Sequence, residues 1–229
     1  MGQRRGPVEV LVRGCVVFDL DGTLVDTAPL CADIVNAMLA ARGVGRRVTR
    51  SQAAPHMVLG GQAMIAALLG ADCGDPETAL GEFRERYAAL PTRPESLFPG
   101  ARTALEALAN HGFALAVWSN KSQALCDKTI TELGLGEYFA AVVGTGPGVP
   151  LKPDAVGFDL ALSRAGGDRA RCVYVGDSEL DHKVATVAGV AMVMMTHGYG
   201  SSHPPGAAIA RSFAELPTVV EALVPVLAL

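Results

Sequence analysis

Four aspartates stand in short polar turns, each directly after an apolar run, and their spacing could serve metal-assisted chemistry. Asp19 and Asp21 follow one run, and Asp177 and Asp181 follow another. Residues two apart in an extended segment face the same way, and residues four apart share one face of a helix start. Clustered carboxylates repel one another unless a cation lies among them. A hard divalent ion with oxygen ligands, Mg²⁺ above all, fits such a group.

A lysine and two neutral polar residues add the means to hold an anion. Lys152 precedes a predicted helix, and Ser119 and Asn120 stand at the end of another apolar run. An ammonium group can neutralise a phosphoryl group, while hydroxyl and amide groups can hydrogen-bond its oxygens. Together these side chains supply a nucleophile, an acid/base, a metal site, a cation and phosphate-oxygen donors. That set of groups is typical of phosphoryl transfer.

Strand and helix patterns alternate along most of the chain and indicate how these residues are positioned. The predicted strands are 16–18, 114–118, 141–143, 172–175 and 191–195. The predicted helices that alternate with them or follow them are 101–109, 122–133, 155–165, 181–188 and 216–227. This alternation predicts an α/β fold with a parallel sheet covered on both faces. The carboxyl ends of parallel strands lie at one edge, so we expect the four aspartates to converge there.

The segment 26–97 differs, because it shows helical periodicity and no strand pattern. Its predicted helices are 28–41, 60–69 and 76–89. We therefore expect an α/β core domain of residues 1–25 and 98–229, interrupted by an all-helical domain of residues 26–97. We interpret the arginines at 46, 47 and 50 as a solvated turn and the Gly-, Ser- and Pro-rich stretch 198–205 as a loop.

Composition restricts the class of protein. The chain has 229 residues, of which 50% are hydrophobic, so it can bury a sizeable core. A net charge of −4 argues against a nucleic-acid-binding surface. Five cysteines without CxxC spacing indicate a reducing compartment. No signal peptide pattern is present, and no apolar run approaches the roughly 20 residues of a membrane helix. We expect a cytoplasmic monomer or homodimer that binds neither nucleic acid nor membrane.

Four motifs in a fixed order carry a resemblance to a known family. They are Asp19-Leu20-Asp21-Gly22-Thr23-Leu24-Val25-Asp26, Ser119-Asn120, Lys152-Pro153 and Gly176-Asp177-Ser178-Glu179-Leu180-Asp181. From about Cys15 to Gly200 the sequence resembles the haloacid dehalogenase-like (HAD) hydrolase superfamily, in its phosphatase branch. The resemblance implies a Rossmann-like core, with segment 26–97 as the family's C1-type helical cap.

The resemblance also implies a role for each motif residue. Asp19 would attack phosphorus and form an aspartyl-phosphate, and Asp21 would protonate the leaving oxygen and then activate water. Ser119 and Lys152 would hold the phosphoryl oxygens, with Asn120 beside them.

The same resemblance implies a Mg²⁺ site. Asp19, Asp177 and the backbone carbonyl of Asp21 would bind the ion, and Asp181 would orient these ligands. In the cap, His56 and Gln62 are candidate substrate contacts.

Single residues distinguish the branches of the superfamily. Asp21 argues against a dehalogenase, which lacks this carboxylate, and segment 26–97 has no lysine for phosphonate cleavage. The β-phosphoglucomutase-like members usually carry a histidine early in the cap, but none occurs here before His56. Lys121 could face the cleft or the surface.

The remaining resemblance is to phosphoglycolate phosphatases, through the segments 97–100, 119–121, 134–139 and 198–200. The expected activity is therefore Mg²⁺-dependent hydrolysis of a small phosphomonoester, with 2-phosphoglycolate as the first candidate. A phosphatase of a sugar phosphate, nucleotide or pyrophosphate, a phosphomutase, and a non-enzymatic binder of a phosphorylated ligand stay open as alternatives.

Overall fold

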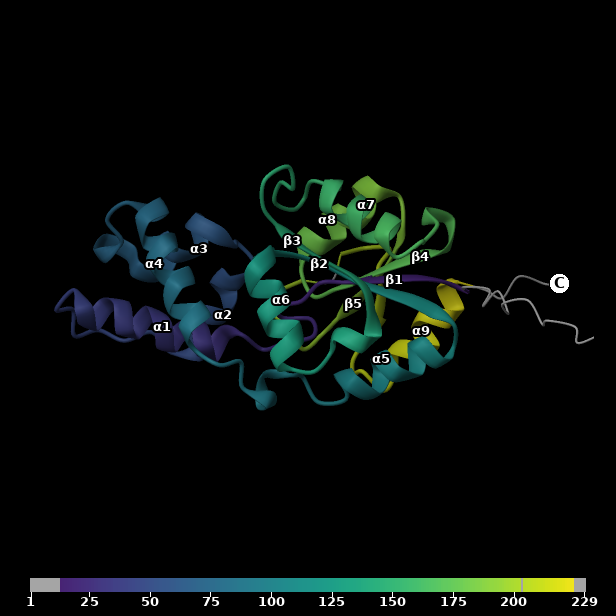
Figure 1. Cartoon of the computed structure of the whole chain (residues 1–229), viewed down its shortest axis with the longest axis horizontal. Coiled ribbons are helices and arrows are strands. Elements are labelled where there is room, and N and C mark those ends of the chain that lie inside the picture. Colours follow the sequence, from purple (N-terminus) through teal and green to yellow (C-terminus); the bar gives the residue numbers. More distant parts are fainter. Residues whose placement is uncertain (1–12, 203, 225–229) are drawn as a thin grey trace, which may run out of the picture.

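A computed structural model describes residues 13–202 and 204–224, which build a six-stranded parallel sheet (Figure 1). The strands are β1 (Gly14–Phe18), β2 (Phe113–Ser122), β3 (Phe139–Thr145), β4 (Cys172–Gly176), β5 (Ala191–Met195) and β6 (Ala208–Ala210). Their order is β3-β2-β1-β4-β5-β6, and every neighbouring pair is parallel. The predicted α/β class is confirmed.

Helices cover both faces of this sheet, so alternate residues of each central strand enter two different cores. Val16 and Phe18 of β1 pack with α5 (Ala101–Asn110), α6 (Gln123–Glu132) and α9 (Leu216–Leu223). Cys15 and Val17 face α7 (Val156–Arg164) and α8 (Glu179–Ala188). Strands buried on both faces are continuously apolar, which explains why β1 to β5 were visible in the sequence as apolar runs.

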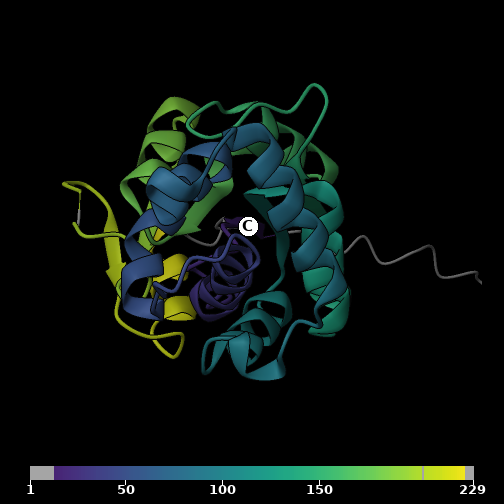
Figure 2. The ribbon, with the colours of Figure 1, turned by 90° about the vertical axis from the view of Figure 1, so that its left-hand side faces the viewer.

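Segment 26–97, the helical segment, has an apolar core of its own. It contains α1 (Ala28–Ala41), α2 (Arg50–Met57), α3 (Gly61–Leu69) and α4 (Pro76–Ala89), which lie together at one end of the molecule (Figures 1 and 2). Ile34, Ile65 and Phe83 are among the side chains buried between these helices. The segment leaves and re-enters the sheet at neighbouring points, since Val25 pairs with Leu97.

Two elements were missed because they carry weak signals. Helix α2 begins with a capping box, in which the Thr49 side chain accepts from Gln52 N and the Gln52 side chain accepts from Thr49 N. It contains Pro55 and buries only Ala53, so it has no apolar stripe to detect. Strand β6 has three residues at the edge of the sheet. Strand β2 also extends four residues beyond its predicted end, through an irregularity in its pairing with β3.

The arginines at 46, 47 and 50 are exposed, as we predicted, but two of them also make specific contacts. Arg50 begins α2 and pairs with Asp26 at 2.8 Å. Arg46 donates to the main-chain oxygens of Leu68 and Leu69 at the end of α3. The last helix ends at Leu223, and residues 225–227 of its predicted span lie outside the described residues.

No helix within 13–202 and 204–224 combines the length and the apolar composition needed to cross a bilayer.

The contact between α7 and Trp118 predicts an unusual response to a Gly→Ala change. Alanine in place of helical glycine normally stabilises a helix, by about 0.5–1 kcal/mol. At Gly157, however, an added Cβ would lie 2.5 Å from the buried indole of Trp118. We expect Gly157→Ala to lower the free energy of unfolding by about 1–3 kcal/mol, measured by urea titration.

Gly81 in α4 provides the matched control, because an added Cβ there meets no atom within 4 Å. Gly81→Ala should raise the free energy of unfolding. Stabilisation by both substitutions would contradict the tight contact at Trp118.

Candidate active site

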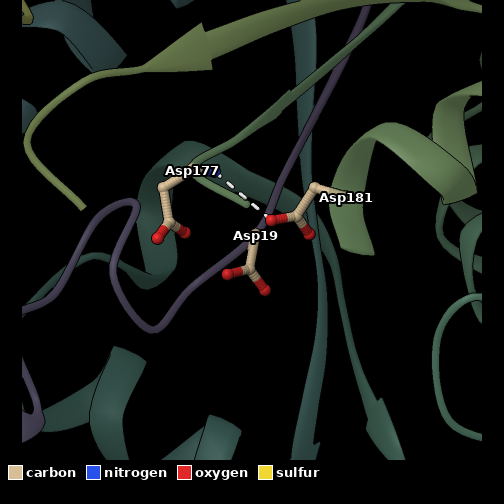
Figure 3. A group of neighbouring side chains, drawn as sticks. All are labelled: Asp19, Asp177 and Asp181. Carbon is tan, nitrogen blue, oxygen red and sulfur yellow. Dashed lines mark hydrogen bonds between the residues drawn. The ribbon is translucent and has the colours of Figure 1, made fainter. Parts of the chain in front are cut away.

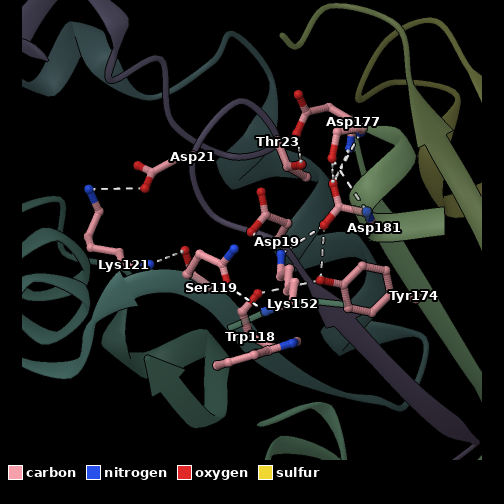
Figure 4. A network of polar contacts seen from close by, with 12 residues as sticks. Asp19, Asp21, Thr23, Trp118, Ser119, Lys121, Lys152, Tyr174, Asp177 and Asp181 are labelled. Carbon is pink, nitrogen blue, oxygen red and sulfur yellow. Dashed lines mark hydrogen bonds and ion pairs between the residues drawn. The ribbon is translucent and has the colours of Figure 1, made fainter. Parts of the chain in front are cut away.

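The three central strands bring the chemistry-bearing residues to one edge of the sheet (Figure 4). Asp19 directly follows β1, and Asp177 directly follows β4. Ser119 and Asn120 lie in β2, where its register with β3 shifts between Trp118 and Ser122. Such irregularities re-aim side chains near the ends of strands. The predicted convergence of these residues at the carboxyl edge is therefore present in the structure.

Lys152 is buried between two carboxylates. Its Nζ lies 2.5 Å from Asp19 Oδ1 and 2.8 Å from Asp181 Oδ1, and only 3% of its side chain is exposed. Burial by itself lowers the pKa of Lys152, but the charges of Asp181 and Asp19 outweigh it and hold that pKa well above its usual value. Lys152 therefore stays a cation, and its charge lies at the centre of the site.

Asp19, Asp177 and Asp181 form a compact acidic cluster (Figure 3). Each offers one oxygen, and these oxygens lie within 4.8 Å of one another. Burial and the neighbouring carboxylates raise the pKa of Asp19 above its usual value, although Lys152 opposes the shift. Burial and Asp181 raise the pKa of Asp177 to about 7. An oxygen-rich cluster with this excess of negative charge fits a hard divalent cation.

Asp177 is oriented by donors to both of its oxygens. The Thr23 hydroxyl donates to Oδ1 at 2.9 Å, and the backbone N–H of Tyr199 donates to Oδ2 at 2.7 Å. Gly22 permits this approach, because an added Cβ there would lie 2.6 Å from Asp177 Oδ2. Its positive φ of 92° also suits glycine.

Asp181 belongs to a capping box at the start of α8. Its Oδ2 accepts from the Ser178 hydroxyl at 2.6 Å and from Ser178 N at 3.1 Å, and the Ser178 side chain accepts from Asp181 N. Its Oδ1 accepts from Lys152 and from the Tyr174 hydroxyl, the latter at 3.2 Å. The contacts by which Asp181 caps α8 therefore also fix the orientation of its carboxylate.

Asp21 does not join the acidic cluster. Its Oδ2 lies 3.0 Å from Lys121 Nζ, which is also 3.1 Å from the Tyr87 hydroxyl of α4. Its Oδ1 is buried and has no hydrogen-bond partner among the residues that the structure describes. The sequence left the direction of Lys121 open; the structure places it inside the site, with 7% of its side chain exposed.

Ser119 and Asn120 line the same cavity, and the side chain of each accepts a hydrogen bond from a backbone N–H. The Ser119 hydroxyl accepts from Lys121 N at 3.3 Å and is buried. Asn120 Oδ1 accepts from Lys152 N at 2.8 Å and so fixes the segment that carries Lys152. Asn120 thus positions the lysine, a contact that its predicted role did not include.

A cavity of about 90 Å³ lies between the strand ends and the helical segment. The helical segment contributes mostly apolar side chains to it, namely Met57, Met64, Leu80 and Phe83, together with Tyr87 and the charged Arg84. Neither cap residue that we named as a candidate substrate contact lines it. His56 lines a separate hollow with Arg46 and Arg47, and Gln62 is exposed next to Gly61.

Tyr199 connects the acidic cluster to the start of the helical segment, a role that sequence reasoning missed. Its hydroxyl accepts from Thr27 N at 2.7 Å and Ala28 N at 3.0 Å, and donates to Asp26 Oδ1 at 2.9 Å. Its own N–H holds Asp177. The glycines that flank Tyr199 were the sequence feature that could have indicated this role. Position 198 must be glycine, because an added Cβ there would lie 2.2 Å from Asp177.

Comparison with known proteins identifies the family. Residues 16–195 match the family model described as haloacid dehalogenase-like hydrolase, which is most of the chain. The chain belongs to the haloacid dehalogenase-like hydrolase family. It is 36% identical over 224 residues to the phosphoglycolate phosphatase of Rhodobacter capsulatus, with 90% of this chain and 96% of that one covered. It is also 36% identical to the phosphoglycolate phosphatase of Xanthomonas campestris pv. campestris (strain 8004) over 185 residues, 80% of this chain and 83% of that one.

Solved HAD-like structures share the fold. A structure from Haemophilus somnus 129pt, described as a predicted phosphoglycolate phosphatase, superposes with a TM-score of 0.79 at 24% identity. It covers 91% of this chain and 99% of its own. CbbY from Rhodobacter sphaeroides in complex with phosphate gives a TM-score of 0.69 at 25% identity, with 89% and 96% covered. The resemblance drawn from the four motifs is confirmed at the level of the family.

The Tyr199 contacts predict a stability effect that is separate from chemistry. Tyr199→Phe removes the acceptor of two buried N–H groups, which then lack a partner. We expect the free energy of unfolding to fall by about 1–3 kcal/mol, measured by urea titration. Tyr138 is the control, because its hydroxyl makes no hydrogen bond within the described part of the chain. Equal losses in Tyr199→Phe and Tyr138→Phe would contradict the assigned contacts.

Proposed function

We propose that this HAD-family hydrolase is a Mg²⁺-dependent phosphomonoesterase whose main substrate is 2-phosphoglycolate. The observation that supports this chemistry best is that two neighbouring carboxylates have different surroundings. Asp19 lies in the acidic cluster beside Lys152, whereas Asp21 turns away from the cluster and presents a buried oxygen without a partner. Two neighbouring carboxylates in different environments suit a nucleophile and an acid/base.

In the first step that we propose, Asp19 is the nucleophile. Its Oδ1 is bound by Lys152, and its Oδ2 makes no hydrogen bond within 13–202 and 204–224. Oδ2 is therefore available to attack phosphorus. A P–O bond to Asp19 forms as the bond from phosphorus to the ester oxygen breaks. Lys152 and the Ser119 hydroxyl are placed to neutralise and hydrogen-bond the phosphoryl oxygens.

Asp21 serves as the acid and then as the base. Its Oδ1 donates a proton to the departing ester oxygen, which leaves as an alcohol. The resulting carboxylate then takes a proton from water as that water attacks the phosphorus of the aspartyl-phosphate. Inorganic phosphate leaves, and Asp19 and the protonated Asp21 are regenerated. Positioned proton transfer of this kind contributes about 10²–10⁴-fold in rate.

The residues present fit Mg²⁺. We propose that the carboxylates of Asp19 and Asp177 and the backbone carbonyl of Asp21 hold it. Asp181 is the orienting residue, because five contacts from Lys152, Tyr174, Ser178 and Asp177 N already occupy its oxygens. When bound, the ion offsets the charge of the acidic cluster and of the phosphoryl oxygens.

We also propose that the helical segment is a cap over the reaction. It contributes Tyr87 and other side chains to the cavity that contains Asp19 and Asp21. A cover of this kind excludes water and contacts the leaving group. The substrate assignment draws on the relatives at 36% identity, both named phosphoglycolate phosphatases.

Phosphate release from a panel of esters tests the proposed function. The panel contains 2-phosphoglycolate, a hexose phosphate, a nucleoside monophosphate and pyrophosphate, each assayed with Mg²⁺ and with EDTA. We expect the highest kcat/KM for 2-phosphoglycolate and loss of release in EDTA. Preference for another ester would discard the substrate, and conversion of the hexose phosphate to an isomer without free phosphate would indicate a mutase. Undiminished release in EDTA would contradict the metal requirement.

The metal site makes a prediction that calorimetry can check without turnover. Asp177→Asn removes one charge from the acidic cluster and should weaken Mg²⁺ binding by at least about tenfold. Asp33→Asn, at an exposed carboxylate of α1, should bind Mg²⁺ as the wild type does. Equal affinities in Asp177→Asn and Asp33→Asn would contradict the assignment of Asp177 as a ligand.

A further inference from the structure

Lys121 is a buried cation whose position the reaction steps above do not explain. Its Nζ lies 3.0 Å from Asp21 Oδ2 and 3.1 Å from the Tyr87 hydroxyl, and 4.3 Å from the centre of the Tyr87 ring. Only 7% of its side chain is exposed, and it lines the cavity. A buried ammonium carries a large desolvation cost, which contacts with its neighbours must offset. Figure 4 shows the Lys121 ammonium on the far side of Asp21 from the acidic cluster.

We propose that Lys121 binds the carboxylate of the leaving group and thereby selects short esters that carry a carboxylate next to the phosphorylated carbon. This inference rests on the proposed function and names the residue that recognises its substrate. Lys121 then contacts two acidic groups, the carboxyl group of Asp21 and the carboxylate of the substrate, and its charge offsets that of the substrate carboxylate.

The geometry of a short ester brings its carboxylate to Lys121. The ester oxygen must lie within hydrogen-bond distance of Asp21 in order to receive its proton. In 2-phosphoglycolate one CH₂ group separates that oxygen from the carboxylate, so the two groups are about 3 Å apart. Lys121 Nζ is itself 3.0 Å from Asp21. The substrate carboxylate can therefore meet the ammonium without displacing either residue.

Two other cations line the cavity, and neither is placed as well. Lys152 already binds Asp19 and Asp181 on the phosphate side. Arg84 of α4 is exposed and forms no ion pair in the described part of the chain, so it is the rival that the experiment must test. It lies one helical turn before Tyr87, the α4 residue that contacts Lys121.

Tyr87 adds a dependence on the helical segment. Its ring is buried in the core of that segment, and its hydroxyl meets Lys121 from the strand edge. The helical segment therefore supplies one of the two polar partners of the ammonium, and Asp21 supplies the other. Recognition of the carboxylate and closure of the site are thus linked through a single contact.

A selectivity ratio shows whether Lys121 recognises the substrate carboxylate or only positions Asp21. The ratio is kcat/KM for 2-phosphoglycolate divided by kcat/KM for 2-hydroxyethyl phosphate, which has the same skeleton without the carboxylate. We expect Lys121→Met to lower this ratio by about 10–100-fold, because a charge-assisted hydrogen bond is lost for one substrate alone. Lys121→Arg should retain most of the ratio, and Arg84→Met should leave it within about twofold of wild type.

Each other outcome overturns a specific statement. Equal losses for both substrates in Lys121→Met would reduce Lys121 to a residue that positions Asp21. If the ratio falls in Arg84→Met and not in Lys121→Met, Arg84 and not Lys121 recognises the substrate carboxylate. A wild-type ratio near one would overturn both this inference and the proposed substrate. A high wild-type ratio that survives in Lys121→Met would overturn the inference alone. Thermal unfolding checks each variant, and Lys121→Gln is the second uncharged variant should Lys121→Met not fold.

Discussion

The site depends on one buried ammonium group, that of Lys152, held between Asp19 and Asp181. Removing charges from water is costly, so this arrangement persists only because each partner supplies the opposite charge. The lysine leaves one Asp19 oxygen free and fixes the other. Lys152 also links three parts of the chain. Its backbone N–H donates to Asn120 of β2, and its side chain donates to Asp181 at the start of α8, so the segment after β3 is held to both. The positions of Asp19, Lys152 and Asp181 are therefore fixed together.

The parallel sheet brings these residues close enough to make those contacts. The parallel strands β2, β1 and β4 are neighbours in the sheet. The segments that follow them, although distant in sequence, therefore lie side by side at one edge. The chain leaves this edge after Asp26 to build the helical segment and returns at Leu97 beside Val25. Tyr199 joins that departure point to Asp177. The start of the helical segment and the orientation of Asp177 are consequently linked by hydrogen bonds through Tyr199.

Much of this architecture could be predicted from the sequence, because strands buried on both faces are unbroken apolar runs and polar residues cluster where they end. The cluster around Asp19 followed from that pattern and from the order of the four motifs. Lys121 and Tyr87 could not be placed, since their contact joins segments 34 residues apart and leaves no local spacing. His56 was named because it stood near the paired glycines, but α2 directs it to a different hollow. Tertiary packing, which periodicity does not encode, decides such positions.

The measurement that tests the central claim most directly is the site of covalent phosphorylation. The protein is mixed with excess ³²P-labelled 2-phosphoglycolate and Mg²⁺, quenched in acid within the first turnovers, and digested for peptide mapping. We expect hydroxylamine-sensitive label on the peptide that contains Asp19, with none in Asp19→Asn. Rapid phosphate release without any protein-bound label, or label on another residue that persists in Asp19→Asn, would contradict the assignment of Asp19 as nucleophile.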